Sequence, residues 1–250
     1  MDIVLLGSGN VATNLGSALV AAGHRIKQVY SRTETNAQAL AETLGAVATT
    51  DLARIDARAD MYIIAVKDDA LGAVAAQLAR MQGIVVHTAG SVDMAVLAAH
   101  VADYGVLYPL QTFSKAKAVD FSTVPIAVEA SREPVWERLE ALAGSLSERV
   151  FRCDSKQRLS LHVAAVFACN FTNHFYAIAA DILIKYGLEF DLIRPLILET
   201  ARKVMAHQPK DVQTGPAARN DVRTIEKHME LLSADPALAQ LYRLISEQIG

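Results

Sequence analysis

The stretch that decides the fold is Ile3-Val4-Leu5-Leu6-Gly7-Ser8-Gly9-Asn10-Val11-Ala12, followed by a helix-forming segment through Ala22. The four apolar residues predict a buried strand, and the glycine pair predicts a tight turn that opens a helix. In this spacing Gly7 permits the turn, Gly9 lets the backbone approach a pyrophosphate, and Ala12 lets the helix pack closely on the strand. Free N–H groups and the helix dipole then face the phosphates. Residues 7–12 therefore predict a dinucleotide site of the G-x-G-x-x-A type.

Length and composition limit the possible functions. The chain has 250 residues, 52% hydrophobic and 20% charged, which suits a globular protein of two domains. A formal net charge of −3 gives no electrostatic support for nucleic-acid binding. Cys153 and Cys169 form neither a disulfide framework nor a metal-ligand pattern, so we expect no metal. Met1-Asp2 provides no basic segment before the first strand, so we expect a cytoplasmic protein.

Strand-like and helix-like segments alternate as far as residue 153. The predicted strands are 3–6, 26–31, 60–66, 83–88, 104–108, 124–129 and 148–152. The predicted helices between them are 10–22, 33–44, 68–81 and 133–146. This alternation predicts a mainly parallel sheet with right-handed crossovers, so residues 1–153 should form an α/β domain of the Rossmann type.

The pattern changes to helix after Asp154. Breaks are predicted at Gly187, 208–209, 214–216 and 235–236, and Asp154 or Ser155 can cap the first long helix. Residues 154–250 should therefore form an all-α domain. Its segment 159–184 is apolar enough to resemble a membrane span, but it contains five polar or ionisable residues, which favours a buried or dimer-forming helix.

The end of the second strand decides which dinucleotide is favoured. NAD-binding domains place a carboxylate there for the ribose 2′-hydroxyl, whereas this chain has Ser31-Arg32-Thr33. An arginine flanked by two hydroxyls suits a 2′-phosphate, so NADP is favoured over NAD. The alternative is that Arg32 is a solvated surface residue and Glu34 binds the ribose in a shifted register.

Three further strand ends carry candidate residues, because ligands bind outside the carboxyl ends of such strands. Val66-Lys67 should cover the adenosine ribose or the pyrophosphate, and Asp68 is interpreted as a helix cap. Thr88-Ala89-Gly90, with Ser91, should lie beside the nicotinamide, although a plain turn explains the segment equally well. Gln111 and Thr112 belong to the loop 108–113, which we expect to form a wall of a substrate pocket.

The helical half carries candidates for proton transfer and substrate binding. Residues 162, 170, 173, 174 and 181 form a polar stripe at helical spacing. Either His174 or His162 is a candidate general acid, and Asn170 and Asn173 are candidates to orient a carbonyl or carboxylate. The alternative is a stripe that faces water. In the loop 214–221, Arg219 is a candidate for a substrate carboxylate with Asp221 fixing its guanidinium, or Asp221 simply caps a helix.

These segments together resemble a known family. Residues 7–12, 31–32, 87–91, 108–113, 170–174 and 214–221 are similar to a family assigned as NADP oxidoreductases, in which a Rossmann-like domain precedes a helical domain of unknown function, DUF2520. More distantly, the chain is similar to pyrroline-5-carboxylate reductase and to F420-dependent NADP reductases. It lacks the small-residue helix start of the former, and Asp68 replaces a proline. The Lys-x-x-x-Asn pair of 3-hydroxyacid dehydrogenases is also missing.

We therefore predict an NADP-dependent oxidoreductase. It should transfer a hydride between the nicotinamide and a small carbonyl, imine or hydroxy compound in a cleft between its domains, and it should form a homodimer through the C-terminal helices. No nucleic-acid or membrane partner is expected. One alternative is an NADP-binding sensor or scaffold without turnover. Another is an enzyme that binds FAD or a nucleotide sugar on the same fold.

Overall fold

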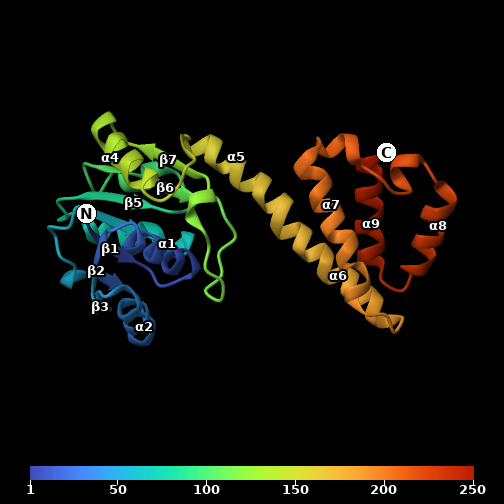
Figure 1. Cartoon of the computed structure of the whole chain (residues 1–250), viewed down its shortest axis with the longest axis horizontal. Coiled ribbons are helices and arrows are strands. Elements are labelled where there is room, and N and C mark those ends of the chain that lie inside the picture. Colours follow the sequence, from blue (N-terminus) through green and yellow to red (C-terminus); the bar gives the residue numbers. More distant parts are fainter. The chain divides into compact units, whose positions relative to one another are not determined.

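The computed structural model describes residues 1–250 and divides into two compact units, Met1–Asn173 and His174–Gly250. All strands lie in the first unit and form one sheet in the order β3-β2-β1-β4-β5-β6-β7-β8 (Figure 1). The strands are β1 (Asp2–Leu6), β2 (Arg25–Tyr30), β3 (Val47–Thr49), β4 (Met61–Ile64), β5 (Ile84–His87), β6 (Tyr104–Pro109), β7 (Ile126–Ala130) and β8 (Val150–Arg152). The predicted Rossmann-type α/β fold is confirmed.

The sheet is parallel except where β7 pairs antiparallel with β6. The connection between these two strands contains no α-helix, only the short 3₁₀ turn Phe121–Thr123, and a parallel crossover is usually made by an α-helix. The chain therefore folds back on itself. Helix α4 (Glu133–Gly144) then provides the crossover that returns β8 parallel to β7. The short strand β3 was not predicted from the sequence.

Each face of the sheet has its own core. Ile3 and Leu5 pack in a cluster with α1 (Asn10–Ala21), α2 (Glu34–Leu44) and α4. Val4 and Leu6, which point the other way because side chains alternate along a strand, pack with α3 (Asp68–Ala75) and the 3₁₀ turn Met94–Leu97. The apolar run at residues 3–6 therefore forms a strand buried on both faces.

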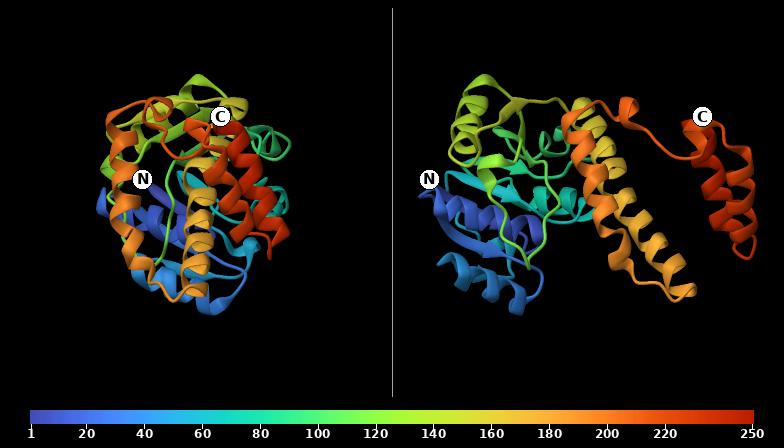
Figure 2. Two further views of the ribbon diagram at one scale, coloured as in Figure 1. Left: turned by 90° about the vertical axis from the view of Figure 1, so that its right-hand side faces the viewer. Right: turned by 45° about the vertical axis from the view of Figure 1, so that its right-hand side comes forward.

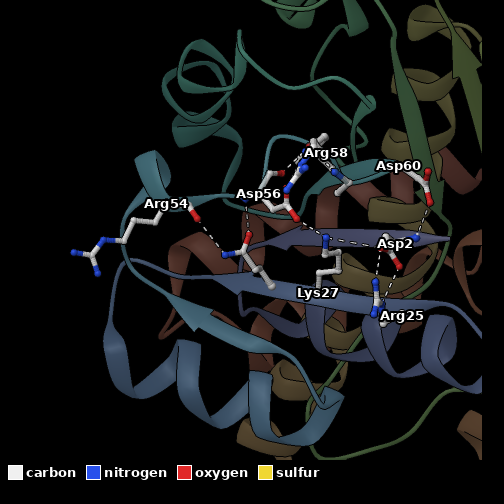
Figure 3. Close-up of polar contacts among 10 residues, drawn as sticks. Asp2, Arg25, Lys27, Arg54, Asp56, Arg58 and Asp60 are labelled. Atoms are coloured by element: carbon white, nitrogen blue, oxygen red, sulfur yellow. Dashed lines mark hydrogen bonds and ion pairs between the residues drawn. The ribbon is translucent and has the colours of Figure 1, made fainter.

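Ion pairs fasten the amino ends of the first strands (Figure 3). The Arg25 guanidinium donates two hydrogen bonds to the Asp2 carboxylate, one of them at 2.8 Å. Lys27 pairs with Asp56, and the Asp2 N–H donates to the Asp60 carboxylate at 2.8 Å. These contacts lie at the amino edge of the parallel strands and join β1 to β2 and to the segments before β4. They leave the carboxyl edge of the sheet free for a ligand.

The chain after β8 is helical. Its α-helices are α5 (Ser155–Ala165), α6 (Thr172–Lys185), α7 (Arg194–Ala206), α8 (Val222–Leu231) and α9 (Pro236–Ile249). All four predicted breaks separate helices. Asp154 caps α5 in a capping box with Gln157, as one of the two predicted alternatives. The predicted domain limit at residue 153 follows the last strand, whereas the compact units divide between Asn173 and His174.

A π-helical segment, Val166–Phe171, joins α5 to α6, so that residues 155–185 form one continuous helix. By length and composition alone this helix is able to cross a membrane. The expectation that it is largely buried is wrong for the single chain, since Arg158 is its one buried residue. In the second unit α8 and α9 lie side by side (Figure 2), and His228 Nδ1 is 2.7 Å from the Tyr242 hydroxyl.

Candidate functional site

A groove of about 650 Å³ follows the carboxyl ends of the strands in the first unit. It is formed by the segments after β1, β2, β4, β5 and β6 and by one residue of α5. Its lining residues include Gly7, Ser8, Gly9, Asn10, Val11, Ser31, Arg32, Thr33, Val66, Lys67, Asp68, Thr88, Ala89, Gly90, Tyr108, Gln111, Lys115 and His162. The structure therefore brings nearly all the predicted cofactor-binding residues to one continuous surface.

The two glycines of the first loop differ in their surroundings. Gly7 has a φ of +129°, and a Cβ on it would lie 2.1 Å from the Ala65 carbonyl oxygen. Gly9 precedes α1, and a Cβ there would meet nothing within 4 Å. No side chain caps α1, so its first N–H groups face the groove without a competing partner. Ala12 is fully buried in the core beneath this loop. The loop fits a phosphate group.

The predicted phosphate residues lie together at one end of the groove. The Ser8 and Ser31 hydroxyls are 2.8 Å apart, which joins the glycine loop to the end of β2. Arg32 follows Ser31 and lines the groove, so its guanidinium is available for a 2′-phosphate. Glu34, the alternative ribose ligand, does not line the groove and accepts a hydrogen bond from Gln38 at 2.8 Å. This geometry favours the phosphate interpretation.

Lys67 and Asp68 occupy the middle of the groove after β4. The interpretation of Asp68 as a helix cap is wrong, because Lys67 is the N-cap of α3 and Asp68 lies in the first turn. The Asp68 carboxylate instead accepts a short hydrogen bond from the Ser91 hydroxyl. Together with Arg32 and Lys115, Lys67 makes the lining predominantly cationic, which suits a polyanionic ligand.

The far end of the groove holds a tyrosine–histidine pair. The Tyr108 hydroxyl at the end of β6 lies 3.1 Å from His162 Nδ1 on α5. Gly90 lies against both rings, because a Cβ on it would come within 2.7 Å of His162 and 3.0 Å of Tyr108. Burial raises the pKa of Tyr108 above its usual range. His162 is thus the one predicted general acid that lines this groove.

A buried polar network holds α5 against the loop that follows β5. Arg158, 1% exposed, pairs with the Glu129 carboxylate and donates to the Val92 carbonyl at 2.6 Å. The Ser155 hydroxyl donates to Glu129 at 2.8 Å and accepts from the Met94 N–H at 3.0 Å. His162 follows Arg158 by four residues and so lies on the same helix face. The network therefore fixes where His162 meets Gly90.

His87 is fully buried at the end of β5, next to this network. Its Nδ1 accepts a hydrogen bond from the Ala89 N–H at 3.2 Å. Burial, assisted by the positive charge of Arg158, lowers the pKa of His87 from 6.5 to about 4. The neutral imidazole therefore supports the Thr88–Gly90 turn at neutral pH.

The remaining predicted residues do not line the groove. Thr112 hydrogen-bonds the Gln111 side chain, through its N–H at 2.8 Å. Asn170 and Asn173 are exposed, and His174, Arg219 and Asp221 belong to the second unit. Asp221 caps α8 by accepting from Thr224, and it forms no ion pair with Arg219. A role of these residues in substrate binding or catalysis stays a prediction.

Sequence reasoning missed parts of this site for identifiable reasons. Tyr108 was placed in a pocket loop without a chemical role, although its position at a strand end was a usable signal. Lys115 lies in a long loop with no motif, and Asn14 attaches that loop to α1 by donating to the Ser114 carbonyl at 3.0 Å. The Arg158–Glu129 pair joins segments 29 residues apart, which no local pattern reveals.

Comparison with protein families divides the chain in two. Residues 2–91 match the family described as NADP oxidoreductase, coenzyme F420-dependent. Residues 124–249 match the domain of unknown function DUF2520. No curated protein shows significant similarity to the chain.

Solved structures share the whole architecture. A protein of Bacteroides fragilis assigned as an NADP oxidoreductase is 50% identical, with a TM-score of 0.94 over 99% of this chain and 97% of that one. An imine reductase of Myxococcus stipitatus in complex with NADP⁺ is 16% identical, with a TM-score of 0.72 over 100% and 94%. A pyrroline-5-carboxylate reductase of Coxiella burnetii is 15% identical, with a TM-score of 0.61 over 99% and 98%. The last two likenesses concern the fold alone.

The matched DUF2520 region covers half of the chain, and the identity to the Bacteroides fragilis protein extends over nearly all of it. The glycine loop, the Ser31-Arg32 strand end and the helical second half agree with both findings. The chain therefore belongs to the DUF2520 family.

Proposed function

We propose that this protein is an NADP-dependent oxidoreductase that acts on a small carbonyl, imine or hydroxy compound. The observation that carries the proposal is the groove, which connects Arg32, the open glycine loop and the Tyr108–His162 pair along one edge of the sheet. In open α/β sheets a dinucleotide binds across the carboxyl ends of the strands where their order reverses, which here is at β1.

Different residues of the groove would bind different parts of the dinucleotide. Arg32, Ser31 and Thr33 would hold the 2′-phosphate, and the loop Gly7–Val11 with the start of α1 would hold the pyrophosphate. Bound NADPH supplies the hydride, and the protein supplies position, exclusion of water and a proton. The non-enzymatic alternative is not favoured, because the related proteins are named as oxidoreductases and reductases.

Thermal unfolding with and without nucleotide tests the cofactor. NADPH should raise the melting temperature more than NADH does, and Arg32→Ala should remove most of that difference by removing the charge opposite the 2′-phosphate. Arg54→Ala is the matched control, because Arg54 is an exposed arginine outside the groove. Equal shifts with NADPH and NADH in the parent protein would contradict the proposal. A screen of keto acids, aldehydes and cyclic imines for NADPH oxidation then identifies the substrate class.

A second part of the proposal is a homodimer in the cytoplasm, and the helical half supports the homodimer. Beyond Cys153 the buried residues are Arg158, Ala217 and Ala239, so the helices leave their apolar faces uncovered in the single chain. Large exposed apolar side chains concentrate there, including Phe167, Leu192, Leu196 and Met205. Exposed apolar side chains in such number are typical of a protein–protein interface. A second copy of the chain would cover it.

A further inference from the structure

We propose that the Tyr108 hydroxyl is the catalytic proton donor of the reduction, and that His162 is the positioning residue that orients this hydroxyl and restores its proton. The inference rests on the proposed function, because it requires a substrate at the Tyr108 end of the groove. It differs from the sequence-based hypothesis, in which a histidine itself protonates the substrate.

The order of the strands places Tyr108 at the reactive end of the groove. Along the groove edge the strands run β2, β1, β4, β5 and β6, with Arg32 just after β2 and Tyr108 near the end of β6. A dinucleotide with its 2′-phosphate at Arg32 and its pyrophosphate at the glycine loop extends its nicotinamide half toward β5 and β6. Tyr108 and Gly90 are the groove residues at that end.

The Tyr108–His162 contact depends on the packing of β6, the Gly90 loop and α5. The hydroxyl lies 3.1 Å from His162 Nδ1, and the two rings meet edge to face at 71°. Gly90 is the residue that lets them approach, since any Cβ there would lie 2.7 Å from His162. Arg158, four residues before His162, anchors α5 to the Val92 carbonyl. Three segments, β6, the loop after β5 and α5, therefore fix the orientation of the Tyr108 hydroxyl.

The charge state of Tyr108 suits a donor. Burial raises the pKa of the phenol, so it is protonated at neutral pH and is an acid rather than a base. The ionisable groups that face it are Arg158 and His162 from α5, Asp68 from α3 and Cys153 after β8. Arg158 opposes the rise and so stabilises the phenolate that forms after proton transfer, while Asp68 and Cys153 add to it.

Tyr108, His162 and water supply the proton that the reduction consumes. When NADPH reduces a carbonyl or imine carbon, the Tyr108 O–H bond breaks and its proton forms a new bond to the substrate oxygen or nitrogen. The electron pair of the broken bond stays on the Tyr108 oxygen. His162 takes up a proton from water and returns a proton from Nδ1 to that oxygen, so that it ends neutral with its hydrogen on Nε2. The substrate gains one hydride and one proton, and NADPH is oxidised to NADP⁺.

The test uses the charge difference between the two cofactor forms and needs no substrate. Tyrosine labelled with ¹³C at the ζ carbon gives one resonance per ring, and the Tyr108 resonance is the one absent from Tyr108→Phe. NADP⁺ carries a positive ring and NADPH does not. A unit charge within ~10 Å lowers a phenol pKa by about one unit at an effective dielectric constant of about 20. The Tyr108 resonance should therefore titrate at a lower pH in the NADP⁺ complex than in the NADPH complex.

Matched controls separate this effect from binding. Tyr104 lies at the opposite end of β6 and does not line the groove, so its resonance should not change between the complexes. Tyr108→Phe should keep the thermal shift with NADPH, since Arg32 and the glycine loop are intact. If both cofactors bind and the Tyr108 resonance titrates at the same pH in both complexes, the inference is overturned. If neither cofactor binds the parent protein, the proposed function fails and this inference fails with it.

The role of His162 has its own spectroscopic signature. A neutral His162 that accepts the Tyr108 hydroxyl proton at Nδ1 must carry its hydrogen on Nε2. The ring nitrogen chemical shifts should report this tautomer in the parent protein and a loss of the preference in Tyr108→Phe. A hydrogen on Nδ1, or a tautomer unaffected by Tyr108→Phe, would overturn the assignment of His162.

Discussion

At the scale of single residues, Gly7 and Gly9 have different functions within one loop. Gly7 cannot be replaced because its φ of +129° and the nearby Ala65 carbonyl exclude a side chain. Gly9 meets no protein atom, so the space beside it is available to a ligand. The sequence motif alone does not distinguish these two requirements.

Gly9→Val should abolish NADPH binding while the protein stays folded. The added side chain would occupy the space of the pyrophosphate, and it costs about 1 kcal/mol of stability at this N-cap position. Thermal unfolding with and without NADPH measures both effects. Gly7→Ala is the contrasting variant, in which the melting temperature itself should fall. Retained NADPH binding by Gly9→Val would contradict the placement of the pyrophosphate.

His87 should make stability depend on pH between about 6.5 and about 4. Its pKa is lowered to about 4 in the folded protein, so in this range the unfolded chain binds a proton that the folded protein does not. The contribution of neutral His87 to the free energy of unfolding is complete above pH 6.5, and it decreases as the pH falls toward 4. We expect a loss of about 2 kcal/mol between pH 7 and pH 5. Urea unfolding at both pH values measures it, and His87→Leu should show a loss smaller by that amount.

At the scale of elements, the Arg158–Glu129 pair holds α5 in place. Arg158→Met should lower the free energy of unfolding by about 3–5 kcal/mol, because it leaves Glu129 without its partner and frees the Val92 carbonyl. Arg54→Met removes an exposed pair with Asp51 and should cost at most about 1 kcal/mol. Urea unfolding compares the two variants. A similar loss in the free energy of unfolding for both variants would show that the buried Arg158–Glu129 pair stabilises the protein no more than the exposed Arg54–Asp51 pair.

Periodic elements of the fold could be predicted from the sequence, and long-range ones could not. The run Ile3–Leu6 and the Gly7–Ala12 turn specify a strand, a turn and a helix within a dozen residues, so local rules suffice. The antiparallel β7 depends on the missing crossover helix before it, and the Tyr108–His162 contact joins residues 54 positions apart. Neither has a local pattern. The polar stripe was a real pattern, but of its residues His162 alone lines the groove.

At the scale of the whole molecule, the two halves differ in how they bury apolar residues. The large exposed apolar side chains before residue 159 are Met1, Val20 and Val47, and all others lie at residue 159 or beyond it. The first unit has two cores of its own, whereas the second buries almost nothing completely. Exposed apolar surface of this extent is typical of a unit that packs against a partner.

The protein should therefore be a dimer in solution, with an interface in the helical half. Leu192 and Leu196 are each 66% exposed, and the double variant Leu192→Asp, Leu196→Asp should place charges in the interface and give a monomer. Light scattering coupled to size-exclusion chromatography measures the mass. Val47→Asp, at an equally exposed apolar position on β3, should leave the mass unchanged. Because the groove lies within Met1–Asn173, the monomeric variant should still bind NADPH. A parent protein that elutes with the mass of one chain would contradict the dimer and leave the cofactor proposal intact.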